Sequence, residues 1–161
     1  MKQNSIRTSI FCCFLFFLLV MVDQFTKKLA VVYLMDGNIE IIPQIFSLHY
    51  LENSGAAWGL MQNAIVLFVI ITLVVMSAIV FFFIKLPFER RYNYLRLILV
   101  LLASGAVGNF VDRVKQGYVI DFFYIEAIDF PVFNMADIFV CLGAILLIHA
   151  LVFVYKEEKL I

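Results

Sequence analysis

The chain has 161 residues, of which 65% are hydrophobic and only 15% are charged, and its formal net charge is zero. A mean hydropathy of +1.03 lies far above that of soluble globular domains. This composition excludes an ordinary soluble domain, and the sequence has no basic stripe interleaved with aromatics of the kind that binds nucleic acid. It predicts an integral membrane protein.

Four apolar segments are long enough to cross about 30 Å of hydrocarbon, which takes roughly 20 helical residues. The clearest lacks any charged residue and runs from residue 64 to 84. Four spans place both termini on one side, in a single membrane domain covering residues 1–161. The expected spans are residues 9–27, 64–84, 95–111 and 136–155.

The N-terminal segment is also compatible with a secretory signal peptide, because Lys2 and Arg7 precede an apolar run. Residues 23–28 offer no small-residue cleavage pattern, so we expect a retained first helix. The three cysteines all lie in spans, where a thiol usually acts as a small apolar filler. Neither a disulfide nor a metal site is inferred from Cys12, Cys13 and Cys141.

Charged residues predict the orientation. The side that holds both termini and the 85–96 loop has eight basic and three acidic residues, whereas the other side has four basic and nine acidic residues. Basic residues accumulate on the cytoplasmic side of membrane proteins. We therefore expect cytoplasmic termini and an acidic outer face.

Two segments are expected outside the membrane, residues 34–63 and 113–135. In the first, residues 39–43 and 45–51 alternate like β-strands and predict a small outward sheet. The stretch 53–59 is rich in small and polar residues that let the backbone approach a ligand. In the second, residues 118–125 form either a strand or a short helix.

One polar pattern occurs twice at the outer ends of spans, as Asn109 with Asp112 and as Asn134 with Asp137, and Asp121 lies between the two copies. Carboxylates beside hydrocarbon are costly and mark functional sites by default. Residues three apart share a helix face, so each acid has an amide neighbour able to orient it. Small residues at 103–108 would let the third and fourth spans approach closely and bring the acids together.

The acids have different expected environments. Asp137 opens the fourth span, where the helix dipole stabilises a carboxylate. Asp121 lies among apolar residues, where desolvation favours the protonated form. One ionised carboxyl group to activate water and one protonated group to polarise a carbonyl is the logic of an aspartic protease.

Other interpretations stay open at this point. Asp137 could be only a helix cap, Asp112 with Arg113 could be a local ion pair, and Asp23 could brace the first helix. Glu126 and Asp129 are expected to be solvated loop charges. From the residues alone, Asp112 could pair with Asp137 as readily as Asp121 could.

Alternative functions fit less well. A zinc protease needs paired histidines with a carboxylate, but the chain has only His49 and His149, and His149 lies about 18 Å along the helix from Asp137. Ser54 with Lys27 is the only outward pair suggesting a serine protease. A non-enzymatic four-span protein, such as a proton-coupled transporter subunit, would hold ionisable groups deep in its spans.

Five segments resemble, in chain order, the motif set of the bacterial lipoprotein signal peptidase (signal peptidase II) family: residues 23–27, 53–58, 108–113, 119–122 and 133–137. The resemblance implies four transmembrane helices, an outward sheet that cradles substrate, and a mobile lid between the last two spans. It implies an intramembrane aspartyl endopeptidase of the bacterial inner membrane that needs no cofactor. Such an enzyme cuts the signal peptide from a prolipoprotein immediately before a cysteine already carrying diacylglycerol, and globomycin blocks it.

The resemblance also implies residue roles. Asp121 and Asp137 would form the catalytic dyad. Asn53 and Arg113 would bind the substrate backbone, and Asp23 would support the fold near the site. The residues that would line or support the site are Asn109, Asp112, Asn134 and Ala136.

Overall fold

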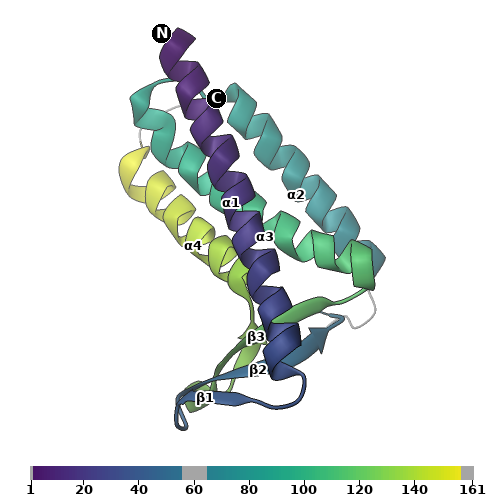
Figure 1. Ribbon diagram of the computed structural model, residues 1–161. Helices are drawn as coiled ribbons and strands as arrows, with labels where there is room; N and C mark the ends of the chain where they lie inside the picture. The colour runs from purple at the N-terminus through teal and green to yellow at the C-terminus, as the bar shows by residue number, and fades with distance from the viewer. Residues whose placement is uncertain (1, 56–64, 157–161) are drawn as a thin grey trace.

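The computed structural model describes residues 2–55 and 65–156 of the chain and has four long helices (Figure 1). Within these residues, four helices are long and apolar enough to cross a membrane. The helices are α1 (Lys2–Leu34), α2 (Ile65–Lys85), α3 (Asn93–Gln116) and α4 (Met135–His149), with a π-helical turn continuing α4 over Ala150–Val154. The predicted mainly helical membrane fold is confirmed.

Helix α1 is longer than the span expected from the sequence. It continues past Lys27 to Leu34 without a break. The sequence suggested an end near Lys27 because charged residues usually leave the hydrocarbon there. Lys27 instead forms ion pairs with Asp23 and Asp112, so its charge is compensated inside the protein.

A four-stranded antiparallel sheet lies at one end of the helices, with strand order β1-β2-β3-β4. Its strands are β1 (Ile39–Ile42), β2 (Phe46–Asn53), β3 (Val119–Ile125) and β4 (Phe130–Phe133). The predicted small sheet is therefore present, and residues 119–125 adopt the strand rather than the helix alternative. Strand β4 was not among the expected elements, and it contains Pro131. Pro131 fits there since β4 is an edge strand, where a missing N–H group is tolerated.

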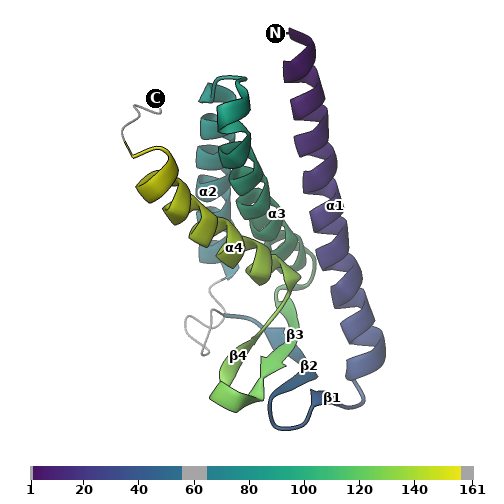
Figure 2. The same cartoon turned by 90° about the vertical axis from the view of Figure 1, so that its left-hand side faces the viewer.

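Both described ends of the chain lie away from the sheet, so we name the two ends of the molecule the terminal end and the sheet end (Figures 1 and 2). Helix α3 is the central element and packs against α1, α2 and α4. It holds most of the buried helical residues, whereas α2 has one buried residue, Ile79. The exposed sides of α2 and α4 are apolar, as expected of helices that face lipid.

Small residues permit the close packing of α3 against α4 and α1, as the sequence suggested. A Cβ atom at Gly105 would collide with the carbonyl oxygen of Ala136. A Cβ atom at Gly108 would lie 2.5 Å from Asp23 Oδ2 and 3.1 Å from Ala136 Cβ. The backbone of α3 therefore approaches its neighbours at the sheet end, where the two Asn-x-x-Asp copies lie.

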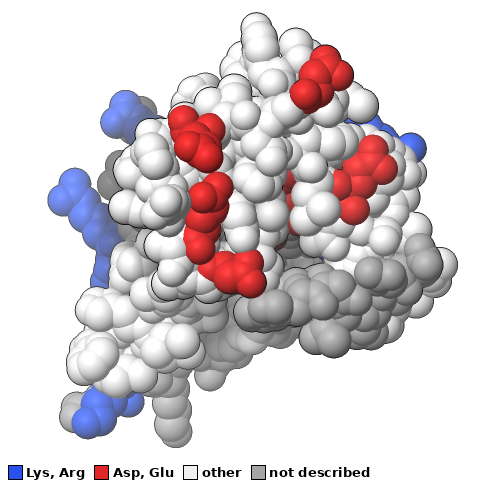
Figure 3. All heavy atoms as spheres, turned by 90° about the horizontal axis from the view of Figure 1, so that it is seen from below, with Lys and Arg blue, Asp and Glu red and all other residues white. Residues whose placement is uncertain are grey.

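Charges differ between the two ends. Seen from below, the sheet end carries acidic side chains over its surface and basic side chains mainly at its margin (Figure 3).

The cysteines are all free thiols; Cys12 is buried, whereas Cys13 and Cys141 are exposed on the helix surfaces.

Candidate functional site

A pocket of about 290 Å³ lies where the helices meet the sheet. We call it the sheet-end pocket. It lies between α2, α3, α4 and strands β2, β3 and β4, and Asp121 and Asp137 both line it. The full lining is Asn53, Gly55, Phe68, Asn109, Arg113, Val119, Asp121, Phe130, Pro131, Val132, Phe133 and Asp137.

Asp121 is held on β3 with only 2% of its surface exposed. Its two carboxyl oxygens accept hydrogen bonds from Asn53 Nδ2 at 2.8 Å and from Asn134 Nδ2 at 2.6 Å. Burial, followed by the nearby charge of Asp137, raises the pKa of Asp121 to about 7, against the opposing effect of the two amides. The Asp121 carboxyl group is therefore divided between protonated and ionised forms near neutral pH.

Asp137 stands in the first turn of α4 and takes part in its N-terminal cap. Its backbone N–H group donates to Asn134 Oδ1 at 3.0 Å, and its Oδ2 accepts from the Asn134 N–H group at 3.1 Å, which completes a capping box. Its other oxygen accepts from Asn109 Nδ2 at 2.8 Å. Asp137 is thus a cap residue, but it also reaches the sheet-end pocket.

Two amides connect the two carboxyl groups. Asn134 Nδ2 donates both to Asp121 and to Asn109 Oδ1, the latter at 3.1 Å, while Asn109 donates to Asp137. The sequence suggested that each amide would orient the acid of its own copy. Neither amide nitrogen does so: Asn134 Nδ2 donates to Asp121 and Asn109, and Asn109 Nδ2 donates across to Asp137 on α4. Within its own copy, the Asp137 carboxyl group accepts from the backbone N–H group of Asn134. The close approach of α3 and α4 makes the cross-helix contact possible.

A buried ammonium group forms ion pairs with two further acids, Asp23 and Asp112. Lys27 Nζ lies 3.0 Å from Asp23 Oδ2 and 2.8 Å from Asp112 Oδ2, and all three side chains are buried. Lys27 also donates to Asn109 Oδ1 at 2.9 Å. Gln24 Nε2 donates to Asp112 Oδ1 at 2.8 Å. The ion partner of Asp112 is therefore Lys27 on α1, which replaces the suggested local pair with Arg113.

Asp23 ties α1 to the start of α4, because its Oδ1 accepts from the Ala136 N–H group at 2.9 Å. Ala136 itself is fully buried. The suggested bracing role of Asp23 thus has a specific partner. Sequence reasoning missed Lys27 as part of this network, although the i, i+4 spacing of Asp23 and Lys27 was a usable signal.

Arg113 and Asn53 lie on the wall of the pocket. The Arg113 guanidinium stacks over the Phe68 ring at 4.6 Å, and its Nη2 is 3.5 Å from the carbonyl oxygen of Gly55. Asn53 Oδ1 accepts from the Gly55 N–H group at 3.0 Å while its amide donates to Asp121. Both side chains therefore present polar groups beside the carboxyl groups.

Side-chain hydrogen bonds hold the connection between β3 and β4 in place. Ser47 Oγ on β2 donates to Glu126 Oε1 at 2.5 Å, and Tyr124 Oη donates to Asp129 Oδ1 at 2.6 Å. Asp129 is exposed, as expected of a solvated loop charge, whereas Glu126 is partly buried because this connection folds back against β2. It leads into β4, whose four residues all line the sheet-end pocket.

The side chains considered for a zinc protease or a serine protease do not form such a site among the described residues. His49 lies 3.7 Å from Glu126 on the sheet, whereas His149 contacts Tyr94 on the helices. Lys27 is ion-paired with two carboxylates and so is no free base for Ser54. Within residues 2–55 and 65–156, no group of three or more His, Cys, Asp or Glu side chains could hold a metal ion.

The fold and this pocket define a class of protein. It is a four-helix integral membrane protein in which two carboxyl groups, bridged by asparagine amides, lie at the junction of the helices and a small sheet. Comparisons with known proteins agree. The sequence model of the family described as Signal peptidase (SPase) II matches residues 15–153. The chain belongs to the signal peptidase II family and is therefore a peptidase of bacterial membranes.

Individual relatives support this assignment over most of the chain. A lipoprotein signal peptidase of Caldanaerobacter subterraneus subsp. tengcongensis is 46% identical and covers 83% of this chain and 90% of its own length. That of Staphylococcus aureus strain MRSA252 is 39% identical, covering 93% and 91%. A solved structure described as a bacterial membrane enzyme at 2.3 Å resolution superposes with a TM-score of 0.81, at 34% identity over 92% of each chain.

Proposed function

We propose that the chain is an aspartic endopeptidase that removes the signal peptide from diacylglyceryl-modified prolipoproteins, cutting before the lipidated cysteine. Asp121 and Asp137 are its catalytic dyad in this proposal, and no metal or cofactor takes part. The family assignment supports the peptidase activity, and the proposed catalytic type rests on the arrangement of the acids.

One observation supports this choice of dyad above all. Four carboxyl groups gather where the helices meet the sheet, and Lys27 forms ion pairs with two of them, Asp23 and Asp112. The other two, Asp121 and Asp137, line the pocket and are bridged by Asn109 and Asn134. The choice between Asp112 and Asp121 that the sequence left open therefore favours Asp121.

The proposed reaction needs one proton shared between the two acids. The ionised carboxylate removes a proton from a water molecule, which attacks the carbonyl carbon of the scissile peptide while the protonated carboxyl group donates to the carbonyl oxygen. When the tetrahedral intermediate collapses, the C–N bond breaks and the amine nitrogen takes a proton from the dyad. The raised pKa of Asp121 suits it to be the protonated partner.

The position of the pocket suits a substrate anchored in the membrane. The pocket lies at the ends of the apolar helices, so a peptide bond just outside the hydrocarbon can reach it. Arg113 and Asn53 are proposed to bind the substrate backbone, and Asn109, Asp112, Asn134, Ala136 and Asp23 to support the site. Diacylglyceryl chains would remain in the surrounding lipid. A globomycin-type peptide would occupy the same pocket.

We also propose that the protein lies in the bacterial inner membrane with its termini in the cytoplasm and the sheet end outside. The acidic surface of the sheet end and the excess of basic residues at the terminal end support this orientation. The substrate cysteine, exported with its lipoprotein, would then meet the pocket on the outer face.

The test is cleavage of a diacylglyceryl-modified prolipoprotein by the purified protein, followed as a gel shift. We expect cleavage by the wild type, its loss with globomycin, and its loss in Asp121→Asn and in Asp137→Asn. Asp112→Asn, which keeps both dyad acids, should retain measurable activity in molecules that remain folded. Full activity of Asp121→Asn or Asp137→Asn would refute the dyad.

A further inference from the structure

A second pocket opens between the same three helices as the sheet-end pocket, but at the opposite end. It measures about 260 Å³ and lies between α2, α3 and α4. We call it the terminal-end pocket. Its lining is apolar apart from Lys85 and consists of Phe82, Lys85, Leu86, Leu95, Leu99, Leu147 and Leu151.

Helical spacing places the two pockets on one face of the protein. Phe68 and Phe82 on α2 are fourteen positions apart, and one of them lines each pocket. The same interval separates Leu95 from Asn109 on α3. Fourteen residues are two heptads, over which an α-helix drifts by only about 40° around its axis.

On α4, Asp137 lines the sheet-end pocket, and Leu151, in the π-helical turn that continues α4, lines the terminal-end pocket. Helices α2 and α3 thus turn nearly the same face toward both pockets, and the α4 segment borders both. At 1.5 Å per residue the pockets are about 21 Å apart along the helices. None of the described residues that line either pocket comes from α1.

We propose that this α2–α3–α4 face is the docking groove for the apolar segment of the substrate's signal peptide, with the start of that segment at the terminal-end pocket. The inference rests on the proposed function and extends it from the cleaved bond to the part of the substrate inside the membrane. The sheet-end pocket would hold the residues around the cleaved bond, and the terminal-end pocket would hold side chains about four helical turns before it.

Length and direction support this occupant. The apolar region of a secretory signal peptide has 7–15 residues and follows a basic N-terminal region that stays in the cytoplasm. As a helix, about 14 apolar residues cover about 21 Å, which is the separation of the two pockets. The cleaved bond follows the apolar region, so it would lie at the sheet end, beside Asp121 and Asp137.

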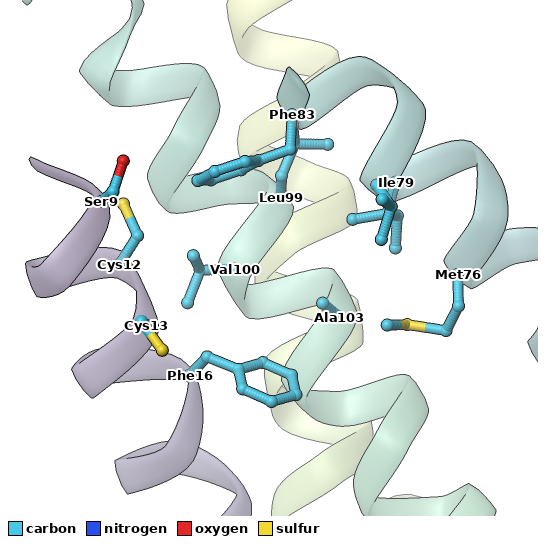
Figure 4. A pocket seen from close by; sticks show the side chains of 11 residues that line it. Ser9, Cys12, Cys13, Phe16, Met76, Ile79, Phe83, Leu99, Val100 and Ala103 are labelled. Atoms are coloured by element: carbon cyan, nitrogen blue, oxygen red, sulfur yellow. The ribbon is translucent and has the colours of Figure 1, made fainter. Parts of the chain in front are cut away.

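A third pocket of similar size, also about 260 Å³, provides an internal comparison (Figure 4). It lies between α1, α2 and α3, where Cys12 and Phe16 of α1 face Met76 and Ile79 of α2. Its apolar lining resembles that of the terminal-end pocket. Unlike the terminal-end pocket, it is walled by α1, which contributes no residue to the sheet-end pocket, so a peptide held against α1 there would lie on a different side of α2 and α3 from the dyad.

Two matched substitutions test the proposal. Leu151→Trp would fill the terminal-end pocket, and Val80→Trp would fill the third pocket; the wild-type side chains are 48% and 49% exposed on the apolar helix surface. We expect Leu151→Trp to raise KM about fivefold or more with kcat nearly unchanged, since the lost contact is the same in ground and transition states. Val80→Trp should leave both constants near wild type.

Substrate length makes the test specific. With a substrate whose apolar region is shortened by one heptad, the peptide would no longer reach Leu151, and the KM penalty of Leu151→Trp should disappear. Equal effects of the two tryptophan variants, or a penalty independent of substrate length, would overturn the proposal. Wild-type cleavage in the same assay shows that such a failure concerns the groove alone, whereas no cleavage by folded wild type would overturn both proposals.

A crosslinking experiment identifies the occupant directly. A photoreactive benzoylphenylalanine at position 147 in Asp137→Asn protein should become attached to the apolar region of a bound prolipoprotein, while the same group at position 80 should not. Attachment at position 147 to phospholipid alone, in the presence of saturating substrate, would show a lipid site and contradict the peptide groove.

Discussion

Lys27 on α1 and Asp112 on α3 form an ion pair 2.8 Å long in which both side chains are almost fully shielded from solvent. The same ammonium group lies 3.0 Å from Asp23, which in turn binds the start of α4. One cation therefore joins three helices directly behind the two acids of the pocket. Asp121 and Asp137, in contrast, take part in neither of these two ion pairs.

Removing this cation should unfold the site. Lys27→Met would leave two buried carboxylates without their cation, a change that typically costs about 3–5 kcal/mol. We expect a strongly lowered thermal midpoint in detergent. Lys28→Met on the exposed next residue is the matched control and should behave as wild type. An unchanged midpoint for Lys27→Met would show that the buried pairs contribute little.

The pH dependence of cleavage should follow Asp121. Its pKa of about 7 means that its proton is lost as the pH rises through neutrality, so kcat/KM should fall on the alkaline side. Asn53 donates to the ionised carboxyl group and thereby lowers this pKa. Asn53→Ala should move the alkaline decline to higher pH in a pH–rate profile; a shift to lower pH would contradict the assignment.

The same group affects folding stability with a definite sign. The ordinary pKa of an aspartate is about 3.9, so between about pH 4 and 7 the folded protein holds a proton that the unfolded chain has lost. The contribution of Asp121 to stability is therefore present below about pH 4 and is lost as the pH rises to about 7. Unfolding midpoints of wild type and Asp121→Asn, compared across this range, should converge at low pH.

Asn134 has two separable roles, and two variants separate them. Asn134→Ala removes both the cap and the amide that donates to Asp121 and Asn109, whereas Asn134→Ser keeps a hydroxyl able to cap α4. The serine variant should be about 1 kcal/mol more stable than the alanine variant. Both should lose activity alike, about tenfold or more, because neither orients the dyad. Greater activity of the serine variant in kcat measurements would assign the amide a purely structural role.

Gly108 should not tolerate a side chain. A Cβ atom there would lie 2.5 Å from Asp23 Oδ2 and 3.0 Å from Asp23 Cγ, so Gly108→Ala should destabilise the protein by about 1–3 kcal/mol. Gly37→Ala is the control, since no atom lies within 4 Å of a Cβ at that position. Thermal unfolding of the two variants measures the difference; equal midpoints would mean that α1 moves aside without cost.

The Ser47–Glu126 hydrogen bond should position the pocket wall formed by β4. Glu126→Ala would release the β3–β4 connection and raise KM, while Glu126→Gln keeps a carbonyl oxygen that can accept from Ser47 and should remain close to wild type. Ser47→Ala should resemble Glu126→Ala. If Glu126→Gln were as impaired as Glu126→Ala, the charge and not the hydrogen bond would be responsible.

The sequence by itself determined the elements that local composition encodes. Long apolar runs, of which only residues 64–84 lack a charge, predict the four long helices. Alternation predicts the strands at 39–51, and charge counts distinguish the two ends of the molecule. The Asn-x-x-Asp repeat and the small residues of α3 also identified where the acids gather. Each of these signals depends on residues close together in the chain, so each can be recognised without knowledge of the fold.

Only the tertiary structure decided which groups pair. Asp112 has Arg113 beside it in sequence but Lys27 beside it in space, and Asn109 donates to an acid on another helix. From the sequence, Glu126 was expected to be a solvated loop charge, but in the fold it accepts a hydrogen bond from Ser47. The energy of a buried charge or amide depends on partners brought from distant segments, and spacing along the chain carries no information about those distances.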